Sequence, residues 1–234
     1  MLRALRHSLK ARLGGITRPI QAGPLEGIRW SVATGSSFIS GRYEQAKTDM
    51  IVAHTAPGDV VYDVGAHAGY YSMMMARLAG PAGRVFSFEP RPLNFGLLSR
   101  HVSVNGFENI TLRTEAVSDT TGPLRFNDET GTGTGHLSPE GRLEVQATTL
   151  DALLAEGLPP PQLIKIDVEG GELGVLRGGA QLIATHRPKI FLATHGDAIH
   201  AECVALLEAA GYRLTTFDQD HGDVESVALY EVPA

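Results

Sequence analysis

The sequence predicts an α/β fold: a Rossmann-like, doubly wound, mostly parallel sheet that ends in a C-terminal antiparallel hairpin. Three observations favour it: β-rich runs alternate with helix-like segments from residue 57 onward, glycines follow the first such run, and two β-rich runs close the chain. The 234 residues suit one domain, because 43% are hydrophobic and 20% charged.

The predicted elements follow one another in a regular order. Runs rich in β-branched and aromatic residues predict strands at Asp59–Val64, Arg84–Phe88, Asn109–Ala116, Leu163–Asp167 and Pro188–Ala193. Apolar residues at helical spacing predict helices from Tyr70 to Leu78, Pro92 to Val102, Glu172 to Leu176 and Ile199 to Ala210.

Two further segments complete the predicted fold. Tyr212–Phe217 and Ser226–Val232 are expected to pair as the terminal hairpin. Between Gly122 and Thr148 the pattern breaks into short β-like pieces around the glycine-rich run Gly131–Gly135. We interpret this insertion as a lid or substrate loop.

The N-terminal end differs from the rest of the chain in charge. We interpret residues 1–40 as a basic helix with a lead-in segment, and residues 41–234 as the catalytic domain. Residues 1–18 carry five basic residues and no acidic one, with leucines at helical spacing on the opposite face. We expect this helix to pack on the main domain or on a second subunit of a homo-oligomer. Contact with an anionic membrane surface is a less favoured alternative.

Composition excludes several classes of protein. Cys203 is the single cysteine, which rules out an internal disulfide and a cysteine cage for zinc or iron, and suits a cytoplasmic location. Beyond residue 18 the net charge is −11, which argues against a nucleic-acid partner. No apolar stretch reaches the ~18–20 residues that span a bilayer.

The first predicted strand leads into a glycine loop. Asp63 lies at the strand end, Gly65 and Gly69 follow with GxxxG spacing, and Glu89 ends the next strand. A dinucleotide site would show GxGxxG, and a triphosphate site GK[ST]. An acid at the position of Glu89 can accept hydrogen bonds from both ribose hydroxyls. The loop therefore favours a nucleoside ligand without phosphates.

Five segments stand out as a set: VYDVGAHAGYYS (Val61–Ser72), FEP (Phe88–Pro90), TLDALL (Thr149–Leu154), LIKIDVEGGELGVLRGG (Leu163–Gly179) and PKIFLATHG (Pro188–Gly196). Together they resemble the FkbM-type methyltransferases. The resemblance covers roughly residues 40 to 215 and implies a Rossmann-like enzyme that depends on S-adenosylmethionine. Two departures from the family pattern are His67, where asparagine is common, and ATHG, where many members carry a glutamate.

The resemblance also implies roles for individual residues. The implied cofactor contacts are the loop residues Asp63, Gly65, Ala66, His67 and Gly69, the ribose-binding Glu89, the adenine-flanking Val117 and Ser118, and also Glu44 and Asp167. Asp167 is expected to face the methionine part of the cofactor or the acceptor.

A hydroxyl acceptor requires a base, or a metal that lowers its pKa. We take Asp167 and His195 as the catalytic residues, although His195 is as well explained by a bond to the following helix or a loop carbonyl. Asp167, Glu169 and Glu172 offer oxygens to Mg²⁺. We favour no metal, with Glu172 at a helix start and Glu169 fixing the glycine turn.

The leading functional hypothesis is O-methylation of a hydroxyl on a sugar, a glycan or a small secondary metabolite. One alternative is N-methylation of a small molecule or peptide. A second alternative is a nicotinamide-dependent oxidoreductase, but the loop lacks the third glycine of GxGxxG. A third is a non-catalytic scaffold, but the acids Asp63, Glu89 and Asp167 are all present.

Overall fold

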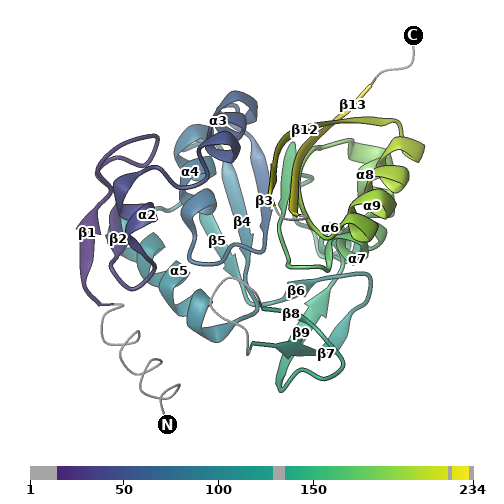
Figure 1. Cartoon of the computed structure of the whole chain (residues 1–234), viewed down its shortest axis with the longest axis horizontal. Coiled ribbons are helices and arrows are strands. Elements are labelled where there is room, and N and C mark those ends of the chain that lie inside the picture. Colours follow the sequence, from purple (N-terminus) through teal and green to yellow (C-terminus); the bar gives the residue numbers. More distant parts are fainter. Residues whose placement is uncertain (1–14, 129–134, 221–222, 232–234) are drawn as a thin grey trace.

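The computed structural model describes residues 15–128, 135–220 and 223–231, and these contain a seven-stranded central sheet (Figure 1). Its strands lie in the order β12-β13-β11-β10-β3-β4-β5. Their bounds are β3 (Val60–Val64), β4 (Arg84–Phe88), β5 (Ile110–Arg113), β10 (Leu163–Ile166), β11 (Lys189–His195), β12 (Tyr212–Asp220) and β13 (Asp223–Tyr230). The five strands from β11 to β5 are parallel, and β13 pairs antiparallel with both β11 and β12. The predicted sheet and terminal hairpin are confirmed.

The order of the strands reverses beside β3. The chain moves outward from β3 through β4 to β5, and then returns to place β10 on the other side of β3. In open α/β sheets, ligands bind beyond the carboxyl ends of the strands at such a switch point. The glycine loop that follows β3 therefore lies where this fold binds its ligands.

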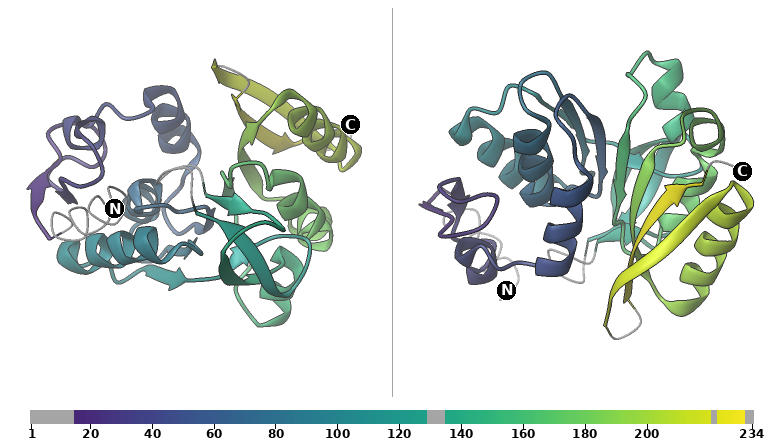
Figure 2. Two further views of the ribbon diagram at one scale, coloured as in Figure 1. Left: turned by 60° about the horizontal axis from the view of Figure 1, so that its bottom comes forward. Right: turned by 90° about the horizontal axis from the view of Figure 1, so that it is seen from above.

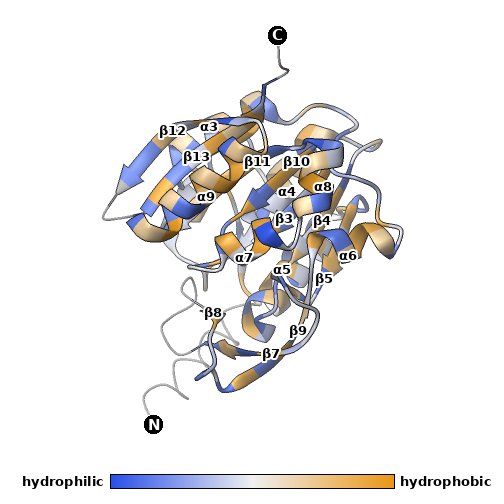
Figure 3. Cartoon of the chain, turned by 90° about the vertical axis from the view of Figure 1, so that its right-hand side faces the viewer, coloured by the Kyte–Doolittle hydropathy of each residue, from blue (hydrophilic) through white to orange (hydrophobic). Residues whose placement is uncertain are grey.

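Helices cover both faces of the sheet (Figures 1 and 2). One face carries α3 (Gln45–His54), α4 (Tyr70–Ala79) and α5 (Pro92–Asn105), and the other carries α6 (Leu150–Ala155), α7 (Glu172–Arg177), α8 (Ala180–His186) and α9 (Asp197–Ala209). Neighbouring residues of one strand face opposite layers: Val61 packs with the first set and Tyr62 with the second. In Figure 3 the second set carries both apolar and polar residues, as expected for helices with one face on a sheet.

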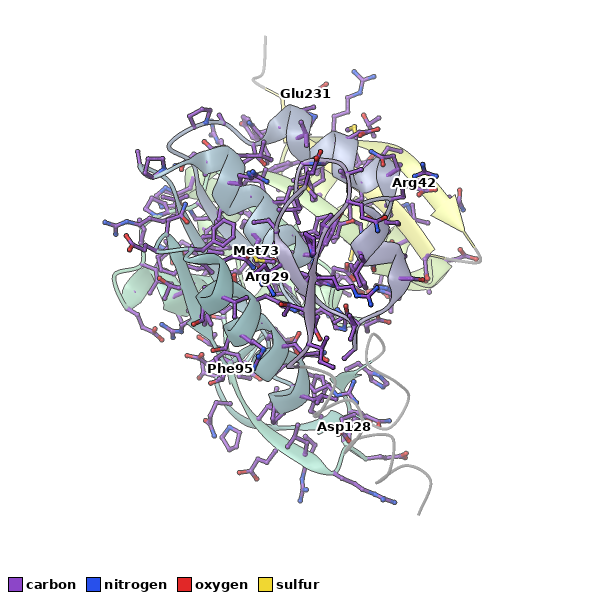
Figure 4. The ribbon with its side chains drawn as sticks, turned by 90° about the vertical axis from the view of Figure 1, so that its left-hand side faces the viewer. Arg29, Arg42, Met73, Phe95, Asp128 and Glu231 are labelled. Carbon is purple, nitrogen blue, oxygen red and sulfur yellow. The ribbon has the colours of Figure 1, made fainter. Side chains whose placement is uncertain are left out.

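The N-terminal segment packs against α4 and α5. It contains β1 (Thr17–Pro19), β2 (Arg29–Ser31) and α2 (Ser36–Ser40), at the edge of the molecule opposite the hairpin (Figures 1 and 2). The side-chain amide of Asn105 accepts from the backbone N–H of Arg29 (2.8 Å) and donates to its carbonyl (2.9 Å). Asn105 also contacts the sulfur of Met73 in α4 (3.9 Å); Figure 4 labels Met73 and Arg29.

Trp30 shares a hydrophobic core with α3, α4 and α5. It is fully buried and stacks on His101, with ring centroids 3.9 Å apart. His101 donates from Nδ1 to the carbonyl of Ala68 (2.8 Å) and accepts at Nε2 from the N–H of Ser31 (2.9 Å). Most of the predicted basic helix lies in residues 1–14, outside the described residues, so its packing and the boundary after residue 40 stay predictions.

The insertion forms a second sheet rather than a loop. Its strands are β6 (Ala116–Val117), β7 (Gly122–Asn127), β8 (His136–Leu137) and β9 (Leu143–Thr148), in the order β6-β9-β7-β8. The predicted strand Asn109–Ala116 was wrong at its end: the chain leaves the central sheet after Arg113, and Ala116 begins the small sheet. Most of the run Gly131–Gly135 lies outside the described residues. None of the described helices is long and apolar enough to cross a membrane.

Candidate active site

A cavity of about 310 Å³ lies at the carboxyl ends of β3, β4, β10 and β11. It brings together most of the residues singled out from the sequence. Those that line it are Glu44, Gly65, Ala66, His67, Glu89, Val117, Asp167 and His195. The wall also includes Phe126 and Leu137 of the small sheet, so the insertion does adjoin the predicted site.

Three residues expected at the cofactor lie behind the cavity wall instead. Asp63 is fully buried, accepts from the hydroxyl of Ser72 (2.5 Å) and lies 3.2 Å from the ammonium of Lys165. Gly69 starts α4 and packs on Leu98, while the N–H of Ser118 donates to a carbonyl of the small sheet (2.8 Å). A direct cofactor contact from any of the three stays a prediction.

The backbone at Gly65 passes directly over the end of β10. Gly65 has a φ of +82°, and a Cβ there would lie 1.9 Å from the carbonyl oxygen of Asp167. The N–H groups of Gly65 and Ala66 both donate to the carbonyl of Phe88, at 3.1 and 3.0 Å. Only glycine fits this conformation and this approach. The loop is thereby fixed between β4 and β10.

Glu89, at the end of β4, is held by the same loop. Its Oε2 accepts from the N–H of His67 (2.8 Å), and its Oε1 accepts from the N–H of Arg91 (2.9 Å). Burial raises the pKa of Glu89 to about 7, and these two backbone bonds oppose the rise. The side chain of Asn94 also donates to this carboxylate, so three of its roughly four acceptor sites are in use. The remaining site can receive a hydroxyl donor from the cavity.

Two lysines contact the carboxylate of Asp167. Its Oδ2 lies 3.2 Å from the ammonium of Lys47 and 3.6 Å from that of Lys165. Burial alone would raise the pKa of Asp167, but Lys47, Lys165 and then His195 together hold it well below its usual range. Asp167 is therefore a carboxylate at any physiological pH, which suits it to stabilise positive charge rather than to accept a proton.

His195 is oriented from behind by a buried glutamate. Its Nδ1 donates to Oε1 of Glu172 (2.8 Å), and its Nε2 faces Asp167 (3.8 Å) and Glu169 (3.7 Å). Burial would lower the pKa of His195, but the bond to Glu172 and the charges of Asp167, Glu172 and Glu169 raise it to about 9. Nε2, the ring nitrogen that does not bond Glu172, thus faces the predicted catalytic aspartate, Asp167.

The acidic segment after β10 is arranged differently from the expectation. Glu172, not Glu169, fixes the glycine turn, because its Oε1 accepts from the N–H groups of Val168 (3.3 Å) and Gly170 (2.9 Å). Asp167, Glu169 and His195 each offer a ligand atom within 4.8 Å of the others, which makes this trio the geometrically possible metal site among the described residues. Glu172 does not line the cavity, so the trio of carboxylates considered for Mg²⁺ does not converge.

Strained backbone is concentrated at the cavity. Non-glycine residues with positive φ among the described ones are Glu44 (39°), His67 (50°), Glu169 (58°) and Arg187 (51°), and the first three line the cavity. Such conformations cost free energy and persist where the surrounding structure enforces them. The fold therefore constrains this wall more tightly than a surface loop.

Sequence reasoning missed several charged residues of the site. Lys165 lies in a strand whose four residues are all buried and donates to the carbonyl of Gly65 (3.1 Å). A lysine inside an apolar strand was a usable signal, because a buried ammonium must be paired. Lys47 and Glu225 carried no such signal, since α3 and β13 reach the cavity only through tertiary packing.

The fold, the glycine loop and the acid at the end of β4 define a class: α/β enzymes that bind a nucleoside cofactor at the switch point of the sheet. The chain belongs to the FkbM methyltransferase family. The sequence model described as "Methyltransferase FkbM domain" matches residues 63–214.

Curated relatives include two named methyltransferases. Hexuronic acid methyltransferase AglP of Haloferax volcanii is 31% identical over 140 residues, which are 58% of this chain and 56% of that protein. 31-O-demethyl-FK506 methyltransferase FkbM of Streptomyces tacrolimicus is 29% identical over 204 residues, covering 70% of this chain and 76% of that one. The match thus spans just over half the length of the archaeal relative.

Solved structures share the fold. A methyltransferase FkbM from Methylobacillus flagellatus superposes with a TM-score of 0.54 and 19% identity, over 74% of this chain and 43% of that one. Fibrillarin of Aeropyrum pernix, solved with S-adenosyl-L-methionine, superposes with a TM-score of 0.52 and 13% identity, over 75% of this chain and 68% of that one. The methyltransferase fold is thereby confirmed.

Proposed function

We propose that the chain transfers a methyl group from S-adenosylmethionine to a hydroxyl of a sugar, a glycan or a small secondary metabolite. The observation that carries the proposal is one cavity of about 310 Å³ that holds the glycine loop, Glu89, Asp167 and His195 together. The named activities of the relatives support the acceptor class, since one is a hexuronic acid methyltransferase and another acts on 31-O-demethyl-FK506.

The residues present fit this cofactor. The carboxylate of Glu89 keeps an acceptor site for a ribose hydroxyl, and Gly65 lets the loop beside it pass close to the end of β10. Val117, at the start of the small sheet, offers an apolar surface for the adenine. When bound, S-adenosylmethionine supplies an electrophilic methyl group on a positively charged sulfur.

The charge of the cavity suits a cationic cofactor. Its carboxyl groups outnumber its basic side chains; they belong to Glu44, Glu89, Glu115, Asp167, Glu169, Asp223 and Glu225, against Lys47, Arg91, Lys165 and His195. Burial raises the pKa of Glu89, Glu169 and Glu225 to about 7, so the surplus of negative charge is complete only above that pH. Opposite charge attracts over the short distances of a partly desolvated cavity. The same surplus disfavours a polyanion such as RNA, and it favours a neutral or cationic acceptor.

His195 is the group best placed to take the hydroxyl proton. Glu172 holds its Nδ1, so the proton is accepted at Nε2, which faces the cavity. The acidic neighbours raise the pKa of His195 to about 9. A positive charge bound in the cavity would lower this pKa and so favour the neutral form that the base role needs. Asp167 stabilises the imidazolium that forms.

Methyl transfer from labelled S-adenosylmethionine to a panel of sugars, glycans and polyhydroxylated metabolites tests the proposal. The expected product carries one methyl ether, and His195→Asn lowers kcat by about 10²- to 10⁴-fold with unchanged cofactor affinity. A nitrogen acceptor would tolerate His195→Asn, which would redirect the assignment to N-methylation. Cofactor binding without turnover across the panel would favour a non-catalytic scaffold. Selective binding of a nicotinamide dinucleotide would favour an oxidoreductase.

A further inference from the structure

Lys47 contacts three carboxylates from three parts of the chain. Its ammonium lies 2.9 Å from Glu44, 3.2 Å from Asp167, and in closer contact still with Glu225. The Lys47 side chain is 5% exposed. An ammonium has three protons, and each of these carboxylates can take one. The group is therefore fully engaged and held in one place.

The contacts of Lys47 join the matched domain to the segments on either side of it. Lys47 and Glu44 precede residues 63–214, the part that matches the family, and Glu225 follows it. Asp167 lies inside the match. The environment of this central carboxylate is thus completed by residues that the family match does not include.

The contacts with the two lysines determine which carboxylate oxygen of Asp167 faces the cavity. Both lysines lie on Oδ2, and the other oxygen, Oδ1, is the one that faces Nε2 of His195 at 3.8 Å. Lys165 also holds Gly65 and Asp63, so its position is set by the glycine loop. Lys47 is the partner that comes from α3, outside the sheet.

We infer that Lys47 is a positioning residue for methyl transfer: it holds Asp167 with Oδ1 toward His195 and draws the start of α3, with Glu44, against the cavity. The inference rests on the proposed function. Glu44 is further fixed by the hydroxyl of Tyr71, which donates to its Oε2 (2.7 Å). Loss of Lys47 would remove one contact from Asp167 and one from Glu44 at the same time.

The chain offers a matched control for a merely structural role. Lys189 of β11 anchors the other end of α3, because its ammonium donates to the carbonyl of His54 (2.7 Å). Lys189 does not line the cavity. Lys47→Met and Lys189→Met therefore each remove one anchor of α3, and only the first touches the site.

The test measures kcat and KM for the acceptor, and the affinity for S-adenosylhomocysteine, in both variants and in Lys47→Arg. We expect Lys47→Met to lower kcat by about 10- to 100-fold. The kcat of Lys189→Met should stay within about twofold of wild type. Lys47→Arg should recover much of the lost kcat, because it keeps the charge. Equal losses in both methionine variants, or no loss in Lys47→Met, would overturn the inference.

Two further measurements keep the test decisive. Lys47→Met leaves partly buried carboxylates without their ammonium partner. If that variant fails to fold, it is replaced by Lys47→Met combined with Glu225→Gln, which removes one of those charges. A crystal structure of the folded variant should show the carboxylate of Asp167 turned away from His195; an unmoved carboxylate contradicts the inference. The crystal structure can be determined whether or not the enzyme turns over. An inactive wild-type protein would therefore contradict the proposed function, while the positioning of Asp167 would still be tested by the structure of the variant.

Discussion

Nδ1 of His195 lies 2.8 Å from Oε1 of Glu172, a fully buried carboxylate that also caps the glycine turn after β10. One residue thus couples the orientation of the predicted base to the backbone that carries Asp167 and Glu169. The same bond is the largest of the contributions that raise the pKa of His195 above its usual value.

Glu172→Gln is therefore expected to lower the pKa of His195 from about 9, because the amide keeps a bond to the imidazole but loses the charge. Titration of the His195 ring resonances by NMR measures this shift. Glu202→Gln, at an exposed position on α9, is the control and should leave the titration unchanged. An unaltered pKa in Glu172→Gln would refute the coupling.

Cofactor affinity should depend on pH through Glu89. Burial raises its pKa to about 7, so above pH 7 the side chain is a carboxylate and accepts from hydroxyls, while below pH 7 it carries a proton. Affinity for S-adenosylhomocysteine is expected to fall by up to roughly tenfold per pH unit below 7. Glu89→Gln should bind more weakly and lose this dependence. A wild-type affinity that is flat from pH 5 to 8 would count against the ribose role.

Alanine substitutions at Gly65 and Gly58 distinguish the stability cost of a steric collision from the cost of backbone strain. Both have positive φ, +82° and +88°, but only a Cβ at Gly65 would meet another atom, the carbonyl oxygen of Asp167 at 1.9 Å. Gly58→Ala is expected to cost about 1 kcal/mol of unfolding free energy. Gly65→Ala should cost on the order of 3 kcal/mol or more, because the loop must move. Urea denaturation of both variants measures the difference, and similar losses would show that the close approach is unimportant.

Metal removal should leave methyl transfer unchanged. Asp167, Glu169 and His195 have a spacing that an ion could use, but Lys47 and Lys165 already neutralise Asp167 and would repel a divalent cation. Activity after exhaustive treatment with a chelator, with and without added Mg²⁺, measures this. Activity that disappears with the chelator and returns with Mg²⁺ would assign the trio as a metal site.

Local motifs were readable from the sequence, and long-range contacts were not. Gly65 and Glu89 follow strand ends that hydropathy alone identifies, so their shared location could be predicted. Helix α3 has almost no amphipathic pattern, and its Lys47 reaches Asp167 across 120 residues of sequence. His101 of α5 is fully buried and bonded to Ala68, because β2 packs onto α5, and no local pattern in the sequence signals that contact.

The central claim is that this cavity binds the cofactor, and calorimetric titration of the intact chain with S-adenosylhomocysteine tests it most directly. The account predicts saturable binding of one ligand per chain, weakened by Glu89→Gln and retained in Glu202→Gln. No detectable heat at any accessible concentration, from a chain whose circular dichroism shows it folded, would contradict it.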